Sequence, residues 1–211
     1  MQEVRPGIWH WQAVHPDWRE DEKWDQRVSS YAIELGDELL LFDPLGVPDE
    51  LRERATAVVL TAPYHERDAR SLGLPVHTPP ADTWQDWVEK FKVDPDRVRG
   101  MESDDLAWLR AGEGEGHFHG PGDWPFGIRA YPGREDNDLV LWLPALNVLV
   151  SGDSLSDFDG SGLDIHLGGR THVTKADVVE RLRPLLDLPV ELVLPAHGLP
   201  TDRSELERVL A

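Results

Sequence analysis

The chain has 211 residues, of which 40% are hydrophobic. A chain of this length buries about 70% of the surface that it exposes when unfolded, so we expect one sizeable domain over residues 1–211, with two smaller domains as the alternative. Forty acidic residues against 21 basic ones give a net charge of −19, which repels phosphate backbones and excludes nucleic acid as a partner. The chain has no cysteine, which excludes disulfides, a thiol nucleophile and thiolate metal sites.

No segment has the length of a membrane span or the pattern of an export signal. Apolar runs such as residues 39–42 and 139–143 are far shorter than the roughly 18 residues that a bilayer span requires. Residues 1–6 contain no basic stretch followed by an apolar core. We therefore expect a cytoplasmic protein without a membrane partner.

Segments typical of strands alternate with segments typical of helices. Apolar residues 28–35 and 39–42 flank Gly36-Asp37-Glu38, a turn-length interruption that predicts a β-hairpin. Further strands are expected at residues 57–61, 126–131, 139–143, 148–151 and 192–194.

Three helices are expected. Asp82 can cap the first, whose apolar side chains recur at helical spacing and predict one stripe facing a core. These apolar residues are Trp84, Trp87, Val88 and Phe91. Thr174, with Asp177 three residues later, predicts the start of the second helix, and the third follows Asp202.

A glycine-rich stretch over residues 112–127 is expected to be a loop. It separates two halves that each contain strands followed by helices. The pattern predicts a sandwich of sheets covered by helices, or a mixed α/β sheet.

The residues that can carry chemistry lie directly after predicted strands, where functional loops gather. Four such segments stand out: Thr61-Ala62-Pro63-Tyr64-His65-Glu66-Arg67-Asp68, Pro132-Gly133-Arg134, Ser151-Gly152-Asp153-Ser154 and Pro195-Ala196-His197-Gly198.

In order and spacing these segments resemble the metallo-β-lactamase fold superfamily. Its members carry a Thr-His-x-His-x-Asp-His loop, then Pro-Gly-His, then Gly-Asp, and a His-Gly near the end. The most specific matches are Ser151-Gly152-Asp153 and Leu194-Pro195-Ala196-His197-Gly198, and Phe42-Asp43-Pro44 is similar to the family's early Asp segment. The resemblance covers the chain from about Val28 to Leu199 and implies an α/β (α+β) fold, a four-layered αββα sandwich.

The resemblance also implies one or two metal ions, most often zinc or iron, which lower the pKa of bound water to about 7. This sequence departs from the family's ligand pattern. Without gaps, the positions of the loop's first His, second His, Asp and third His hold Ala62, Tyr64, Glu66 and Arg67. With one inserted residue, His65 and Asp68 replace the second and third His, and Arg67 replaces the Asp.

Arg134 stands in place of the Pro-Gly-His histidine. Alanine has no donor atom, and guanidinium is a permanent cation without a free lone pair, so the sequence disfavours a two-metal centre. His65, Asp153 and His197, with Asp68 as a possible fourth, remain as ligands for one divalent metal with an open position.

A site without metal is an equal alternative. A buried Asp153 without a cation would cost several kcal/mol. We hypothesise that Arg67, Arg134 or both fill the vacated metal pocket and pair with Asp153, giving a cationic site for a carboxylate or phosphate.

The first functional hypothesis is a hydrolase that acts on a small ester, thioester or phosphate compound with at most one metal. In it Asp68 is a ligand or orients water, and Arg134 or Arg67 clamps developing negative charge. The second is a pseudoenzyme or binding module for a small anionic ligand. The third is a metal-free enzyme that uses His65, Asp68 and Arg134.

Other motifs are given structural roles. His117 and His119 are expected to be solvated in the glycine-rich loop, with a contribution to the site as the alternative. His166 and His172 flank Gly168-Gly169-Arg170, and we expect them to be structural. Trp9, Trp11, Trp18 and Trp24 are expected to cover the core or to form a subunit contact, which leaves a homodimer open, with a platform for a flat ligand as the alternative.

Overall fold

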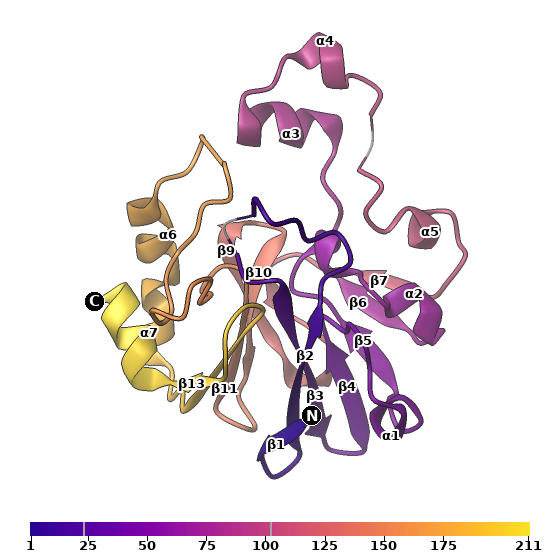
Figure 1. Cartoon of the computed structure of the whole chain (residues 1–211), viewed down its shortest axis with the longest axis vertical. Coiled ribbons are helices and arrows are strands. Elements are labelled where there is room, and N and C mark those ends of the chain that lie inside the picture. Colours follow the sequence, from indigo (N-terminus) through magenta and orange to yellow (C-terminus); the bar gives the residue numbers. More distant parts are fainter. Residues whose placement is uncertain (23, 102) are drawn as a thin grey trace.

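The computed structural model describes residues 1–22, 24–101 and 103–211 and contains two mixed β-sheets that pack face to face (Figure 1). The first sheet has the order β1-β2-β3-β4-β5-β6-β7. Its strands are β1 (Gln2–Arg5), β2 (Ile8–Val14), β3 (Arg27–Leu35), β4 (Glu38–Phe42), β5 (Ala57–Val59), β6 (Val76–Thr78) and β7 (Gly116–Phe118). Strands β1 to β4 pair antiparallel, and β4 to β7 pair parallel.

The second sheet has the order β13-β12-β11-β10-β9-β8. Its strands are β8 (Gly122–Asp123), β9 (Arg129–Glu135), β10 (Asp138–Leu143), β11 (Val148–Gly152), β12 (Leu192–Pro195) and β13 (Thr201–Asp202). Only β11 and β12 pair parallel, because the helical segment between them carries the chain back across the sheet.

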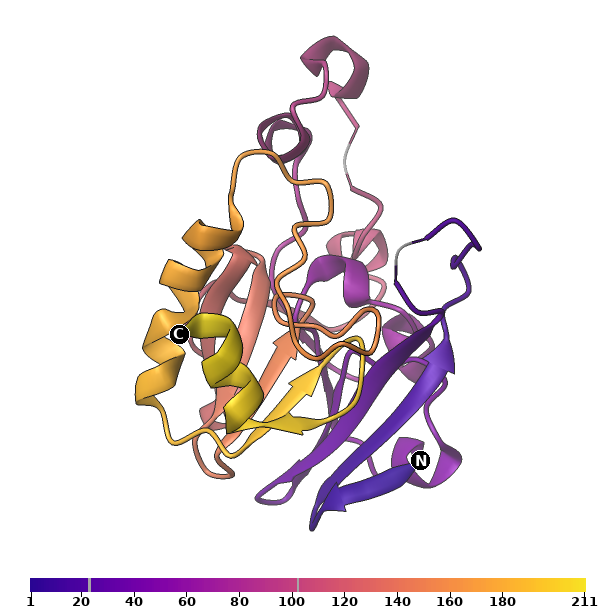
Figure 2. The ribbon, with the colours of Figure 1, turned by 60° about the vertical axis from the view of Figure 1, so that its left-hand side comes forward.

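Helices cover the outer faces of both sheets. The α-helices are α1 (Asp49–Arg52), α2 (Ala69–Leu72), α3 (Trp84–Phe91), α4 (Pro95–Val98), α5 (Ala107–Arg110), α6 (Lys175–Leu182) and α7 (Arg203–Leu210). Short 3-10 turns are η1 (Pro63–His65), η2 (Pro125–Gly127) and η3 (Arg183–Asp187). Helices α6 and α7 lie on the outer face of the second sheet (Figure 2). None of the helices in the described residues is long and apolar enough to cross a membrane.

Alternating side chains of each strand build three apolar layers. In β3 and β4, Tyr31, Ile33 and Leu40 face the core between the sheets, whereas Ala32 and Leu41 face the outer layer with α1, α2 and α5. The central strands, such as β4, β10 and β11, bury both of their faces because a sheet lies on one side and helices on the other. This confirms the αββα sandwich; the alternative of one mixed sheet is wrong.

Several predicted elements are confirmed, namely the hairpin β3–β4, strands β5, β10, β11 and β12, and helices α6 and α7. Thr174 and Asp177 form a capping box at α6, and η3 begins where Pro184 interrupts the helix. Asp202 caps α7.

Three local predictions are wrong. Residues 112–127 are not all loop, because β7 and β8 lie within them. Phe126 belongs to η2 with φ of 62°, so the next strand begins only at Arg129 and continues through Arg134. Thr83, not Asp82, caps α3, since its side chain accepts a hydrogen bond from the Asp86 backbone amide.

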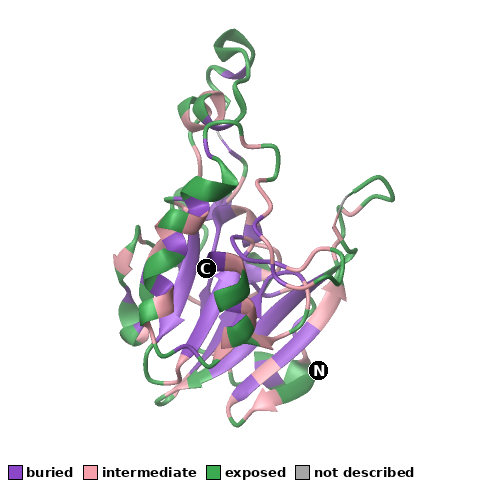
Figure 3. Ribbon diagram, turned by 90° about the vertical axis from the view of Figure 1, so that its left-hand side faces the viewer, coloured by how far each residue is buried: buried purple, intermediate pink, exposed green. Residues whose placement is uncertain are grey.

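Helix α3 does not face a core as predicted. It packs with α4 in a protrusion above the sandwich, whose surface is mostly exposed (Figures 1 and 3). Trp84 and Trp87 are only half-buried, and Phe91 is exposed. An amphipathic stripe indicates which face is apolar but not what covers it.

Gly152 allows the two sheets to approach each other beside the cavity described below. Its φ is +55°, and an added Cβ would lie 2.6 Å from Thr61 Oγ1. The Leu139 backbone amide donates to the Thr61 carbonyl at 2.8 Å, which joins the two sheets at this point. A side chain at position 152 would therefore force the sheets apart.

We expect Gly152→Ala to lower the free energy of unfolding by clearly more than the roughly 1–2 kcal/mol that left-handed backbone alone costs an alanine. Gly36→Ala is the matched control, because Gly36 has φ of +65° and nothing within 4 Å of its added Cβ. Urea unfolding of both variants measures the difference. Equal losses would show that the close approach is unimportant.

Candidate functional site

A cavity of about 990 Å³ opens where strands from both sheets end. His65 and Arg67 follow β5, Asp153 follows β11, and His197 follows β12. Arg134 reaches the same cavity from β9. Five of the six predicted site residues therefore line one cavity.

Asp43 anchors the first loop beneath this cavity. Its Oδ1 accepts a hydrogen bond from the Thr61 backbone amide at 2.9 Å, and its Oδ2 accepts one from the Thr61 hydroxyl at 2.7 Å. His65 Nδ1 donates to the same Oδ2 at 3.0 Å. All three residues are buried, so the imidazole is held with Nε2 as its remaining polar edge.

Asp153 lies between two histidines. Its Oδ1 is 3.4 Å from His65 Nε2 and 3.4 Å from His197 Nε2. Neither contact has hydrogen-bond geometry, and both Asp153 Oδ1 and His197 Nδ1 are buried without a hydrogen-bond partner in the described residues. The two imidazoles and the carboxylate therefore lie close together, as the sequence predicts, and shield one another's polar atoms from solvent.

Arg134 occupies the other side of Asp153. Its Nη2 lies 3.2 Å from Asp153 Oδ2 and donates to the Tyr64 hydroxyl at 2.7 Å. Its Nε donates to Asp138 Oδ2 at 2.6 Å, and its Nη1 donates to the His166 carbonyl at 2.8 Å. Arg134 is 2% exposed and Asp138 0%, so this is a buried, nearly saturated guanidinium.

A second tier of charges extends this network. Arg170 donates from Nε to Glu135 Oε1 at 2.8 Å, and its Nη2 lies 3.7 Å from Asp138 Oδ2. His172 Nε2 is 3.0 Å from Glu135 Oε2, and the Lys90 ammonium is 3.9 Å from the same oxygen. The network therefore connects the cavity to α3.

The two histidines beside Asp153 have opposite pKa shifts. Burial lowers the pKa of His65, but the carboxylates of Asp43 and Asp153 outweigh burial and raise this pKa to about 9. Burial lowers the pKa of His197 to about 4. Burial also disfavours the charged form of Asp153, yet His65, His197 and Arg134 hold its pKa well below its usual value. At neutral pH, His65 is therefore an imidazolium, and His197 is neutral.

These residues do not fit the metal centre of the fold family. Arg134 stands against Asp153 where a ligand histidine would be, and Ala62 provides no donor. Across residues 1–22, 24–101 and 103–211, no group of three or more His, Asp or Glu side chains is placed to hold a metal ion. His65 Nδ1 and Nε2 are both directed at carboxylates, as in an ion pair.

Asp68 is the predicted site residue that the structure does not bring to the cavity. Its Oδ2 accepts a hydrogen bond from the Gly46 backbone amide at 2.6 Å, and the residue is not part of the cavity lining. Glu66 also points away, since it accepts hydrogen bonds from the Leu106 amide and the Trp108 indole. Both carboxylates follow η1, which ends at His65, and the chain turns away at Arg67, whose φ is +38°.

The remaining histidines divide between the cavity and other regions. His166 lines the cavity, and its ring stacks on Phe158 with centroids 4.3 Å apart. His172 lies behind the cavity on Glu135. His117 and His119 lie beside β6, where both rings stack on His77. The alternative that this pair contributes to the site is wrong.

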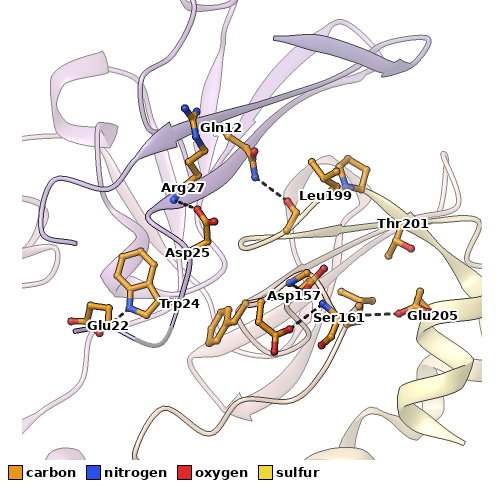
Figure 4. Close-up of a pocket in the computed structure, with 17 residues that line it drawn as sticks. Gln12, Glu22, Trp24, Asp25, Arg27, Asp157, Ser161, Leu199, Thr201 and Glu205 are labelled. Carbon is orange, nitrogen blue, oxygen red and sulfur yellow. Dashed lines mark hydrogen bonds between the residues drawn. The ribbon is translucent and has the colours of Figure 1, made fainter. Parts of the chain in front are cut away.

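Sequence reasoning missed Asp138 and Phe158 and favoured core cover or a subunit contact for Trp24, which lies at the mouth of the cavity. Trp24 and Phe158 each contact His197 edge-on, with centroids 5.1 and 4.5 Å apart. Trp24 also lines an adjacent cavity of about 790 Å³, which has an acidic lining that includes Asp25 (Figure 4). Asp138 carries one recognisable signal, an acidic residue directly before the apolar segment 139–143.

Comparison with known proteins identifies the fold. No protein-family profile and no curated protein sequence matches the chain. Among solved structures, DIM-1 metallo-β-lactamase matches with a TM-score of 0.63 and 13% identity, covering 99% of this chain and 94% of that chain. A metallo-β-lactamase from Pontibacter korlensis matches with a TM-score of 0.61 and 14% identity, covering 99% and 95%. The di-iron-bound form of TTHA1623 matches with a TM-score of 0.57 and 24% identity, covering 87% and 93%. The chain therefore has the metallo-β-lactamase fold.

Loss of the Arg134 side chain should leave two buried carboxylates without their cation. We expect Arg134→Met to lower the free energy of unfolding by about 3–5 kcal/mol, because Asp138 and Asp153 lose their shared cation. Denaturant unfolding measures this loss. The double variant Arg134→Met/Asp138→Asn should recover part of it, since one of the two charges is then absent.

Arg183→Met is the matched control, because Arg183 pairs with Glu180 on the surface and should contribute no more than about 1 kcal/mol. A similar small effect at position 134 would contradict the structural role of its guanidinium.

The raised pKa of His65 predicts that stability depends on pH. Because the folded value of about 9 exceeds the ordinary value of 6.5, the stabilisation is fully present below pH 6.5 and is lost as the pH rises through 9. Urea unfolding at several pH values should show this loss in the native chain and not in His65→Gln. The exposed His117→Gln should retain the native profile. An unchanged profile in His65→Gln would refute the assignment.

Proposed function

We propose that this chain uses the metallo-β-lactamase fold to bind a small anionic compound without a catalytic metal. The observation that carries the proposal is the buried contact of 3.2 Å between Arg134 Nη2 and Asp153 Oδ2. In this arrangement guanidinium supplies the positive charge that a metal would otherwise supply to this carboxylate.

The charge balance around the cavity supports this proposal. Asp43 is paired with His65, Asp153 with Arg134, and Asp138 with Arg134. Each buried carboxylate therefore has an organic cation from the chain itself. A buried charge that is already paired creates no further demand for a divalent ion.

The cavity also suits a small anion. Its volume of about 990 Å³ lies within the roughly 300–1,000 Å³ typical of small-molecule pockets. Arg67, Arg134 and Arg170 all line it. Guanidinium groups favour carboxylate and phosphate ligands because their N–H groups match the spacing of paired oxygens. The net charge of −19 makes nucleic acid and anionic membranes poor partners.

A second candidate is a hydrolase of small esters, thioesters or phosphates that holds one divalent ion, zinc or iron. The convergence of His65 Nε2 and His197 Nε2 on Asp153 Oδ1 favours it. These three residues would be the ligands, with Arg67 and Arg134 beside the substrate. In this hydrolase, Asp68 would be the expected base, but Asp68 does not line the cavity.

Metal analysis separates the two candidates. Protein purified without a His tag, incubated with Zn²⁺ or Fe²⁺ and then desalted should contain far less than one equivalent of metal. His197→Gln should not change that content, and the exposed His117→Gln is the control for surface binding. One equivalent that disappears in His197→Gln and remains in His117→Gln would overturn the proposal in favour of the hydrolase.

A further inference from the structure

Arg67 differs from the other guanidiniums of the cavity because it lacks a carboxylate partner. Its Nη1 donates to the backbone carbonyls of Ser29 at 3.2 Å and Asp43 at 2.8 Å. Its Nε is buried without a hydrogen-bond partner in the described residues. Arg134 and Arg170, by contrast, both lie in ion pairs with buried carboxylates.

The nearby carboxylates are already engaged. Both oxygens of Asp43 accept hydrogen bonds from Thr61, and Oδ2 also contacts His65. Asp153 lies between His65, His197 and Arg134. Within the described chain, Arg67 therefore forms no ion pair, and a partly buried cation without a counter-ion is costly to maintain.

The backbone at Arg67 is held in an uncommon conformation. Its φ is +38°, in the left-handed region that residues other than glycine rarely adopt. Its Nη1 is fixed by two carbonyls, which orients the guanidinium plane. Nε has no accessible surface, so Nη2 is the nitrogen left for a partner in the cavity. Its N–H groups can donate to the oxygens of a carboxylate.

One part of the cavity lining is aromatic and apolar. Trp24 and Phe158 contact His197 from the loops before β3 and after β11. Val28, Ile165 and Leu167 complete this part of the lining. Such surfaces favour a ligand with a flat, apolar body.

The charge of the lining favours a single negative charge on the ligand. Arg134 and Arg170 each contact a carboxylate directly, whereas no carboxylate of the described residues lies in contact with Arg67. Asp21 and Glu22 also line the cavity and repel a second negative charge. A monoanion is therefore favoured over a phosphate dianion.

We propose that the ligand is a monocarboxylate with a flat apolar body, held by Nη2 of Arg67. This inference rests on the proposed function, since it names the class of anion that the same cavity takes. Arg134 then maintains the site, and Arg67 contacts the ligand.

Calorimetric titration with benzoate tests this inference on the full chain. Benzoate should bind the native protein with one equivalent, and neutral benzamide, which has the same shape, should bind at least about tenfold more weakly. Inorganic phosphate should also bind at least about tenfold more weakly than benzoate. These comparisons need no variant, so they hold even if a substitution at Arg67 prevents folding.

Variants then identify the anchoring residue. Arg67→Met should weaken benzoate binding at least about tenfold. Arg67→Lys keeps the charge but replaces the planar guanidinium with an ammonium, so its affinity for benzoate should lie between those of Arg67→Met and the native chain. Arg27→Met is the matched control, because the exposed Arg27 lines the adjacent cavity, and this variant should bind benzoate as the native chain does. Circular dichroism establishes that each variant is folded.

Three results would overturn the inference: equal binding of benzoate and benzamide, native affinity in folded Arg67→Met, or phosphate binding without benzoate binding. The last of these, in metal-free protein, would leave the proposed function intact. One equivalent of metal lost in His197→Gln would instead remove the proposed function itself.

Discussion

The structure of this site depends on buried negative charge at the junction of the two sheets. Asp43, Asp138 and Asp153 lie close together in a region largely shielded from water, where isolated carboxylates would be several kcal/mol less stable than in solvent. His65 and Arg134 supply the opposing charge. His65 of the first half also lies 3.4 Å from Asp153 of the second half, and Arg134 donates to the Tyr64 hydroxyl, so the two cations that neutralise the site also link the two halves of the sandwich. Fold stability and site chemistry are therefore coupled through these residues.

The positions of most site residues could be predicted because they follow strands with a clear apolar pattern. His65, Asp153 and His197 come directly after β5, β11 and β12, and the hypothesis that Arg134 pairs with Asp153 matches the contact of 3.2 Å. Asp68 shows the limit of such reasoning, since spacing along the chain does not reveal that the left-handed backbone at Arg67 is followed by a side chain bound to the Gly46 amide. The metal ligands and catalytic roles assigned from sequence remain predictions.

Other features depend on contacts between distant parts of the chain. Strand β7 lies in a glycine-rich segment with weak strand propensity, and its pairing with β6 defines it. Gly116 permits this placement because Leu109 Cδ2 would lie 3.2 Å from an added Cβ. Trp24 reaches His197 across about 170 positions of sequence, a contact that no local pattern encodes. Long-range packing therefore decides the edge of the sheet and the mouth of the cavity.

Replacement of metal by guanidinium changes what the site can do. Both cations neutralise Asp153, but only a metal offers an open coordination position that lowers the pKa of bound water to about 7. The guanidinium of Arg134 has no lone-pair acceptor role and has most of its N–H groups engaged by Asp138, Asp153, Tyr64 and the His166 carbonyl. It can preserve the geometry of the inherited pocket without activating water. In the function that we propose, binding of an anion falls to Arg67, whose Nη2 is not engaged by a carboxylate. On that proposal, the guanidinium that stabilises the pocket favours ligand recognition over hydrolysis.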